Sequence, residues 1–327
     1  MAARVYTDRD IDLAWLKGKT CAVVGFGAQG RAQALNLRDS GFKVVVGLRR
    51  ASKSRTAARR NRFKVFDTQD AAHLGDVIFL ALPDTKMASV YQNELASNLR
   101  SGQTLLFAHG FAIHYKTLVP RNNVDVVMVA PKGLGPMVRR EFVRGRGVPG
   151  LFAIDRDFTG QARKTALAWA KGIGCSRIGV IETTFREETE TDLFGEQAVL
   201  CGGTSELIRA GFDTLVRTGY APELAYFECL HELKFIVDLI HQAGISGMRK
   251  LISETAKWGE LTVGPKIIDA SVRKRMNKAL SEIRSGKFAH DFIRETGAGR
   301  KRYRKLLRAA NNHPIELVGR TLRRRML

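Results

Sequence analysis

The chain has 327 residues, with a hydrophobic fraction of 44% and an aromatic fraction of 8%, values typical of a globular protein long enough for two domains. Its sequence contains no apolar run of about 18 residues and its N-terminus is polar, so we expect a cytoplasmic protein without a membrane partner. The net charge of +22 suggests nucleic-acid binding. However, the basic clusters at 49–64 and 300–327 lack stacking aromatics between the charges and any known binding motif, so we expect no specific nucleic-acid partner.

The first predicted unit is a buried strand over 20–24, a glycine-rich turn and a helix over 31–40 that ends at Gly41. The turn has the G-x-G-x-x-G pattern, in which the first glycine allows the tight bend, the second admits a pyrophosphate and the third lets the helix lie close to the strand. The phosphates would bind at the helix N-terminus. We therefore interpret this turn as a dinucleotide site, with a plain glycine turn as the alternative. Its residues are Gly25, Phe26, Gly27, Ala28, Gln29 and Gly30.

The second predicted strand, 43–48, ends in a basic and hydroxylated loop containing Arg49, Ser52 and Ser54. An NAD-binding unit usually carries Asp or Glu at this point, to bind the ribose 2′-hydroxyl. Cations and hydroxyls suit a 2′-phosphate instead. The loop therefore favours NADPH over NADH, and a solvated basic loop is the alternative.

Alternating strands and helices continue to about residue 181, with strands predicted at 76–82, 103–108, 124–130, 150–154 and 177–181. In a doubly wound sheet, ligands bind at the C-terminal ends of the strands, where Asp84, His109 and Lys132 fall. Beyond residue 181 only helical periodicity is found. We therefore predict an α/β Rossmann-like domain over 1–181 and an all-α domain over 182–327.

Two acidic pairs stand out in the helical part. Asp192 and Glu196 are four residues apart, as are Glu228 and Glu232, so each pair shares a helix face that continues with apolar residues. A single pair of this kind is best explained as solvated helix carboxylates. Two pairs, each heading an apolar face, favour a metal site, because unpaired carboxylates are costly to bury. Oxygen ligands suit Mg²⁺ or Mn²⁺, and four carboxylates are enough for two ions.

These motifs together carry a resemblance to ketol-acid reductoisomerase, also called acetohydroxy-acid isomeroreductase. The matching stretches extend along almost the whole chain. They include GFGAQGRAQALNLRDSG (25–41), LPDT (82–85), AHGF (108–111), APKG (130–133), EETETDLFGEQAVLCGG (187–203) and ELAYFECLHELKFIVDLI (223–240).

The resemblance implies a helical C-terminal domain of the knotted type and the short, class I length. It implies two Mg²⁺ ions held by the four acids, with one pair supplied by a partner subunit, so that a homodimer is the minimum and a dodecamer the larger alternative. It also implies that Glu188 supports the ligands and that Ser253 contacts the substrate. His109 and Lys132 would be catalytic, and Asp84 and Gly135 would join the cofactor site. The loop 133–137 departs from the usual family sequence.

The implied reaction is a Mg²⁺-dependent alkyl migration in 2-acetolactate or 2-aceto-2-hydroxybutyrate, followed by reduction by NADPH to 2,3-dihydroxy-3-methyl acids. These steps belong to valine, isoleucine and leucine biosynthesis. Glu232 is a plausible proton carrier. Two alternatives stay open from the sequence. One is a metal-free β-hydroxyacid dehydrogenase-type enzyme, and the other is a basic polyanion-binding protein on an inactive Rossmann scaffold.

Overall fold

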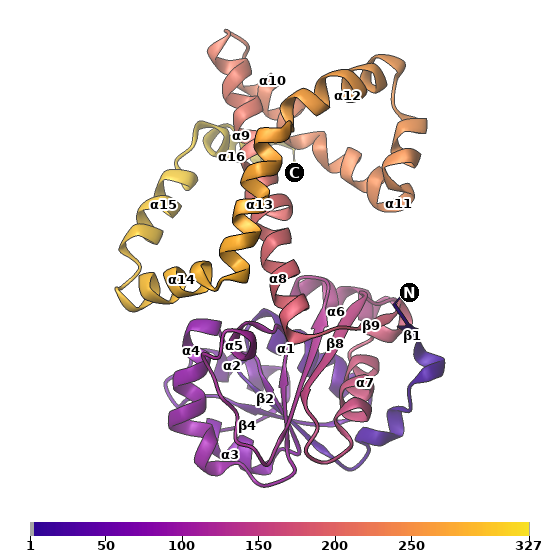
Figure 1. The fold of residues 1–327 in the computed structure, drawn as a ribbon, viewed down its shortest axis with the longest axis vertical. Coiled ribbons are helices and arrows are strands. Elements are labelled where there is room, and N and C mark those ends of the chain that lie inside the picture. The colour runs from indigo at the N-terminus through magenta and orange to yellow at the C-terminus, as the bar shows by residue number, and fades with distance from the viewer. Residues whose placement is uncertain (1–2, 327) are drawn as a thin grey trace. The chain divides into compact units, whose positions relative to one another are not determined.

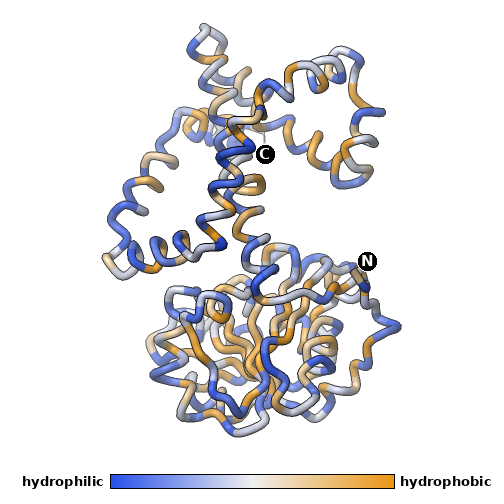
Figure 2. The backbone as a smooth tube through the Cα atoms, in the orientation of Figure 1, coloured by the Kyte–Doolittle hydropathy of each residue, from blue (hydrophilic) through white to orange (hydrophobic). Residues whose placement is uncertain are grey.

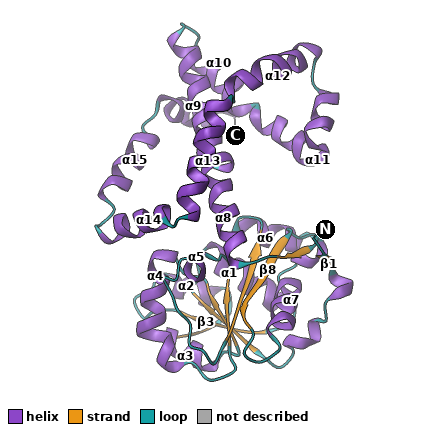
Figure 3. Ribbon diagram, viewed as in Figure 1, coloured by secondary structure: helices purple, strands orange, loops and turns teal. Residues whose placement is uncertain are grey.

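The computed structural model describes residues 3–326, which form two compact units, residues up to Thr189 and residues from Glu190 onward. Strands occur only in the first unit of the described chain, and the second unit is helical (Figures 1 and 3). Helix α8 (Phe185–Gly195) begins in the first unit and ends in the second. The fold class expected from the sequence is therefore confirmed.

The first unit is built on one sheet, which has nine strands within residues 3–326, in the order β1-β9-β8-β7-β6-β5-β2-β3-β4. Neighbouring strands from β7 to β4 in that order are parallel, whereas β7 pairs antiparallel with β8 and β1 antiparallel with β9. The sheet is thus mixed and not wholly parallel. The strands are β1 Val5–Tyr6, β2 Thr20–Val24, β3 Lys43–Gly47, β4 Lys64–Phe66, β5 Val77–Leu80, β6 Thr104–Phe107, β7 Asp125–Pro131, β8 Gly150–Arg156 and β9 Val180–Glu182.

Helices cover both faces of this sheet, and its central strands are buried throughout. In β5, Val77 and Phe79 contribute to one apolar cluster, and Ile78 and Leu80 to the other, because successive side chains point to opposite faces. Figure 2 shows the same strands as mostly hydrophobic. Such a doubly covered sheet explains the near-continuous apolar runs of the sequence. The helices of this unit are α1 Ala28–Asp39, α2 Ser54–Arg60, α3 Thr68–Leu74, α4 Asp84–Val90, α5 Phe111–His114, α6 Gly135–Val143 and α7 Ala162–Gly172.

The second unit has a small core and long helices with exposed apolar side chains. Phe212, Ala225, Tyr226 and Ile315 are its buried cluster, where α10 packs on α9 and α16. Its helices are α9 Gly202–Arg217, α10 Pro222–Tyr226, α11 Leu233–Leu251, α12 Glu254–Ile267, α13 Ala270–Arg284, α14 Lys287–Gly297, α15 Lys301–Asn311 and α16 Pro314–Met326. No helix among the described residues is both long and apolar enough to span a membrane.

Candidate active site

The glycine turn lies between β2 and α1, and the three glycines of the motif differ in why they are needed. Gly25 has φ +102°, and a Cβ there would lie 2.2 Å from the carbonyl oxygen of Ala81. A Cβ on Gly30 would lie 2.5 Å from the Gly25 oxygen, so this residue lets α1 approach the strand. A Cβ on Gly27 would meet no protein atom within 4 Å. Gly27 therefore leaves open space at the N-terminus of α1, where an anion is favoured.

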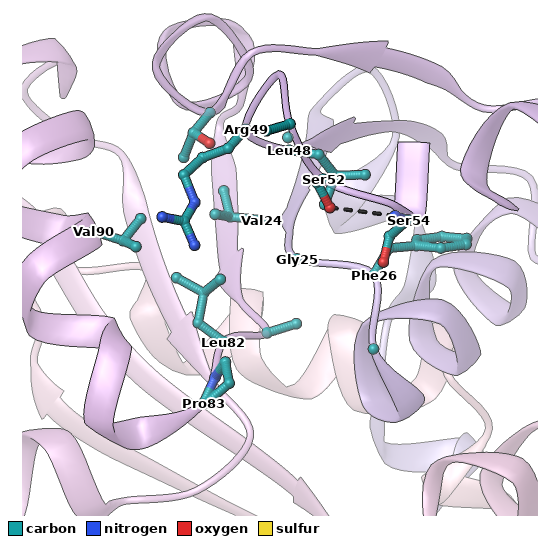
Figure 4. Close-up of a pocket in the computed structure, with 15 residues that line it drawn as sticks. Val24, Gly25, Phe26, Leu48, Arg49, Ser52, Ser54, Leu82, Pro83 and Val90 are labelled. Carbon is teal, nitrogen blue, oxygen red and sulfur yellow. Dashed lines mark hydrogen bonds between the residues drawn. The ribbon is translucent and has the colours of Figure 1, made fainter. Parts of the chain in front are cut away.

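A pocket of about 490 Å³ lies beside this turn and contains the predicted 2′-phosphate loop (Figure 4). Arg49 extends into it toward Leu82 and Val90, on the side opposite Ser54. The Ser52 Oγ accepts a hydrogen bond from the Ser54 backbone N–H at 3.3 Å. The pocket thus brings together Gly25, Phe26, Gly27, Arg49, Ser52 and Ser54 from the predicted cofactor residues.

The other two arginines of this loop are already paired. Arg50 and Arg55 each bind the Asp67 carboxylate at 2.8 Å, and Arg55 also donates to the Leu48 carbonyl. Among residues 3–326, no carboxylate lies within ion-pair distance of Arg49. Asp67 therefore separates the basic loop into two structural arginines and one arginine that is available to an anion in the pocket.

Gly135 and Gln29, two of the other predicted cofactor residues, support the turn from the side. A Cβ on Gly135 would lie 2.3 Å from the Ala28 carbonyl oxygen, so only glycine lets the start of α6 pack against the turn. The Gln29 side chain donates to the Gly133 carbonyl at 2.9 Å. None of Ala28, Gln29, Gly135 and Asp84 is among the residues that line the pocket. Their contacts tie the altered loop 133–137 to the glycine turn.

A buried carboxylate, Glu188 on α8, joins two of the predicted catalytic residues. Its side chain is 1% exposed. One oxygen accepts from His109 Nδ1 at 2.8 Å and from the Gly110 backbone N–H at 2.9 Å, and the other accepts from Lys132 Nζ at 3.1 Å. His109 and Lys132 follow β6 and β7, whose C-terminal ends meet at one edge of the sheet. The sequence placed both residues at this edge, but it did not show that Glu188 lies between them.

Charge and burial oppose each other at this cluster. Burial favours a higher pKa for Glu188, but the hydrogen bond and charge of His109, with Lys132 and the Gly110 N–H, lower that pKa below its usual value. Burial raises the pKa of Asp84, although the nearby His109 acts to lower it. The arrangement therefore keeps Glu188 ionised and presents an imidazole and an ammonium group beside it.

The two acidic pairs both adjoin a wide helical turn that the sequence reading did not foresee. A π-helical turn covers Glu196–Leu200, and another covers Phe227–His231. Each is closed by an i→i+5 hydrogen bond of 3.0 Å, from Cys201 N to Glu196 O and from Glu232 N to Phe227 O. Such turns are rare in helices and are frequent at functional sites. Asp192 lies on α8, one turn beyond Glu188.

The expectation that the acidic faces continue into core is wrong for the chain by itself. Val199 is 50% exposed and Leu200 69%, and Phe235 is also exposed. Glu228 and Glu232 are exposed. Ser253 begins α12, where its Oγ accepts the Ala256 N–H at 3.2 Å. A chain considered alone therefore lacks the apolar cover that the sequence pattern predicts around the carboxylates.

Comparison with known proteins gives consistent matches along the chain. The family model described as the NADPH-binding domain of acetohydroxy acid isomeroreductase matches residues 15–179. The model described as the C-terminal domain of ketol-acid reductoisomerase matches residues 185–327.

Two relatives and one solved structure are similar over nearly their full length. The ketol-acid reductoisomerase (NADP(+)) of Petrotoga mobilis is 53% identical over 321 residues, which cover 98% of this chain and 97% of that protein. The protein of the same description from Pyrobaculum calidifontis is 55% identical over 322 residues and 98% of each chain. A solved NADH-preferring ketol-acid reductoisomerase from an uncultured archean is 43% identical over 98% of each chain, with a TM-score of 0.96.

Proposed function

Since the chain belongs to the ketol-acid reductoisomerase family, we propose that it converts 2-acetolactate or 2-aceto-2-hydroxybutyrate into 2,3-dihydroxy-3-methyl acids. The chain is an enzyme of branched-chain amino-acid biosynthesis with ketol-acid reductoisomerase activity on acetohydroxy acids. Identities above half over nearly the whole length set aside both alternatives, the dehydrogenase-type enzyme and the inactive polyanion-binding scaffold.

The coenzyme is a nicotinamide dinucleotide, and we propose NADPH as the preferred form. The support is the loop after β3, where Arg49 enters the pocket while Arg50 and Arg55 form ion pairs with Asp67. A guanidinium beside two serine hydroxyls offers the donors that a 2′-phosphate requires, and no carboxylate in the loop 48–54 competes for a ribose hydroxyl. The NADH-preferring relative shows that preference varies within the family, so the loop of each chain must be tested by itself.

We propose that Asp192, Glu196, Glu228 and Glu232 hold two Mg²⁺ ions. The donor set fits, because carboxylate oxygens are the ligands that Mg²⁺ takes in proteins. The wide turns at Glu196 and before Glu232 are a second observation in favour of a functional role. When bound, the ions would supply Lewis-acid polarisation of the substrate oxygens.

Glu188 is the observation that carries the proposed mechanism. Its ionised carboxylate fixes His109 in the form with a proton on Nδ1 and holds the Lys132 ammonium at the same edge of the sheet. Lys132 then orients polar groups of the substrate by its positive charge. Glu232 is the proposed proton carrier for the substrate hydroxyl, whose proton must leave before the alkyl group migrates. The reduction step then needs a hydride and one proton.

A homodimer is the proposed minimum active unit, and a dodecamer is the larger alternative. The support is the amount of apolar surface on α11 and α12, where Leu251 is 67% exposed and Trp258 72%. Large apolar side chains exposed in this way favour a protein–protein interface. A second copy would also supply the cover that the acidic faces lack in one chain.

The direct test is oxidation of NADPH in the presence of 2-acetolactate and Mg²⁺, repeated with EDTA and with NADH. We expect oxidation that EDTA abolishes and Mg²⁺ restores. Oxidation that is insensitive to EDTA would refute the metal proposal. Glu232→Gln separates the proton role from metal binding if Mg²⁺ affinity is measured in parallel, and full isomerase activity in that variant would rule the role out.

A further inference from the structure

The corner between α11 and α12 contains Ser253, the residue that the family resemblance assigns to substrate contact. Ile252 and Ser253 are both extended, with φ/ψ of −92°/164° and −66°/159°. The Ser253 hydroxyl caps α12 through the Ala256 N–H and lies 3.0 Å from the Thr255 hydroxyl. Within the helical unit, Figure 1 shows α11 and α12 joined by this short connection. Its direction therefore determines where Ser253 is presented.

An ion pair spans this corner. Arg249, near the end of α11, donates from Nε to both oxygens of Glu260 at 3.0 and 2.8 Å, and from Nη2 to Oε1 at 2.6 Å. The two side chains are 38% and 29% exposed, so water screens the pair only in part. A fork of two nitrogens on one carboxylate restricts both distance and orientation, which a single-point contact does not.

Apart from the buried side chain of Met248, few contacts hold the backbone around this pair. Among residues 3–326, no other ion pair or side-chain hydrogen bond joins α11 to α12. Gly244, inside α11, has φ +71° and ψ 175°, which interrupts the helix one turn before Arg249 is reached. The segment 245–251 is therefore bounded by non-helical backbone at both ends, at Gly244 and at Ile252.

We propose that the Arg249–Glu260 pair is a positioning device that holds the Ser253 hydroxyl in the orientation used for substrate binding. The proposal rests on the proposed function for the identity of the bound group. Without the pair, the corner samples several directions, and only a fraction presents Ser253 correctly. The apparent affinity for substrate falls in proportion to that fraction. Coenzyme binding does not depend on the corner, because the coenzyme pocket is formed by the first unit.

The test uses the full-length enzyme and the near-isosteric variant Glu260→Gln, which removes the charge and keeps the volume. We expect the KM for 2-acetolactate to rise about tenfold, with kcat and the KM for NADPH within about twofold of the wild type. The double variant Arg249→Glu/Glu260→Arg restores the pair with reversed charge and should recover most of the lost affinity. Asp291→Asn, which removes the more exposed ion pairs of Asp291 with Lys287 and Arg294 on α14, is the control and should leave both KM values unchanged.

Amide hydrogen exchange gives a second measurement that does not require turnover. We expect exchange at residues 252–256 to be faster in Glu260→Gln than in the wild type, and unchanged in Asp291→Asn. Equal exchange in Glu260→Gln and the wild type would overturn the proposal, as would equal changes in the KM values for substrate and coenzyme. If the wild type lacks Mg²⁺-dependent turnover, the proposed function fails by itself, and exchange still decides whether the pair orders the corner.

Discussion

Replacing Arg49 by alanine should convert the coenzyme preference without damaging the fold. Arg49 lines the coenzyme pocket, and its side chain makes no ion pair or hydrogen bond within residues 3–326, so its loss breaks no polar contact there. A hydrogen bond to a charged group contributes about 1.5–3 kcal/mol, and the lower half of that range applies because Arg49 is exposed. At about 1.4 kcal/mol per factor of ten, we expect the Kd for NADPH to rise about 10- to 40-fold.

The assay is titration of the enzyme with NADPH and with NADH, followed by nicotinamide fluorescence. NADH lacks the 2′-phosphate, so its Kd should change less than about threefold in the Arg49→Ala variant. Arg50→Ala is the matched control, since Asp67 already binds Arg50 on the solvent side, where Arg50 is 89% exposed. That control should keep the wild-type ratio of the two Kd values.

Two results would refute this reasoning. An equal loss of affinity for NADPH and NADH in Arg49→Ala would mean that Arg49 stabilises the conformation of the loop and does not bind the 2′-phosphate. An unchanged NADPH affinity in Arg49→Ala, with a loss in Arg50→Ala, would mean that the Asp67 pair opens when coenzyme binds and that Arg50 is the phosphate ligand.

Three further sets of variants test the site. Gly110→Ala would place a Cβ 2.4 Å from the Thr189 hydroxyl and should lower the free energy of unfolding by about 1–3 kcal/mol. In Gly27→Ala the added Cβ meets no protein atom within 4 Å, so this variant should keep the wild-type Tm while its coenzyme binding weakens about tenfold. A lowered Tm in Gly27→Ala would contradict this. Glu188→Gln should cost about 1–3 kcal/mol of stability in chemical denaturation, below the usual cost of an unpaired buried charge because Lys132 is 33% exposed and can turn to water. The pKa of Glu188 in the folded protein lies below its ordinary value of 4.5. The contribution of its carboxylate to stability is therefore complete above pH 4.5 and is lost as the pH falls through the folded-state pKa. The stability difference between the wild type and Glu188→Gln should thus shrink on acidification. Glu228→Gln should lower turnover on the order of a hundredfold with NADPH binding intact, and unchanged Mg²⁺ dependence would speak against Glu228 as a ligand.

The central strands and the glycine turn could be predicted because local sequence determines them. Each strand from β2 to β7 that the sequence reading named is a short apolar run, and the turn carries its glycines at fixed spacing. The short strands β1 and β4 were missed, because two or three residues, such as Val5–Tyr6, carry no periodicity. Their pairing is decided by neighbouring strands and not by their own sequence.

The direction of β8 and the wide turns could not be read from the pattern. A helix between two strands normally predicts that the strands are parallel. Here β8 begins beside the end of β7, where the Lys132 N–H donates to the Pro149 carbonyl, and the two strands are antiparallel. Likewise, the contacts of Glu188 bring together segments 56 and 78–79 residues apart in sequence. The exposed apolar residues beyond the acidic pairs, such as Leu200, match a core pattern in the sequence, because the pattern does not show whether the same chain covers that face.

The wide turns at the acidic pairs affect which residues of the following helices can be substituted without moving the carboxylates. One extra residue in a helix rotates everything that follows by about 100° relative to what precedes it. The turn Glu196–Leu200 therefore separates the facing of Asp192 and Glu196 from that of α9, whereas the turn Phe227–His231 separates the facing of Glu228 from that of Glu232 and α11. Helix α9 can therefore exchange its packing residues while Asp192 and Glu196 stay in place, whereas Glu232 turns together with α11. A single-residue deletion within either turn would remove that independence and would turn the whole following helix to a different face.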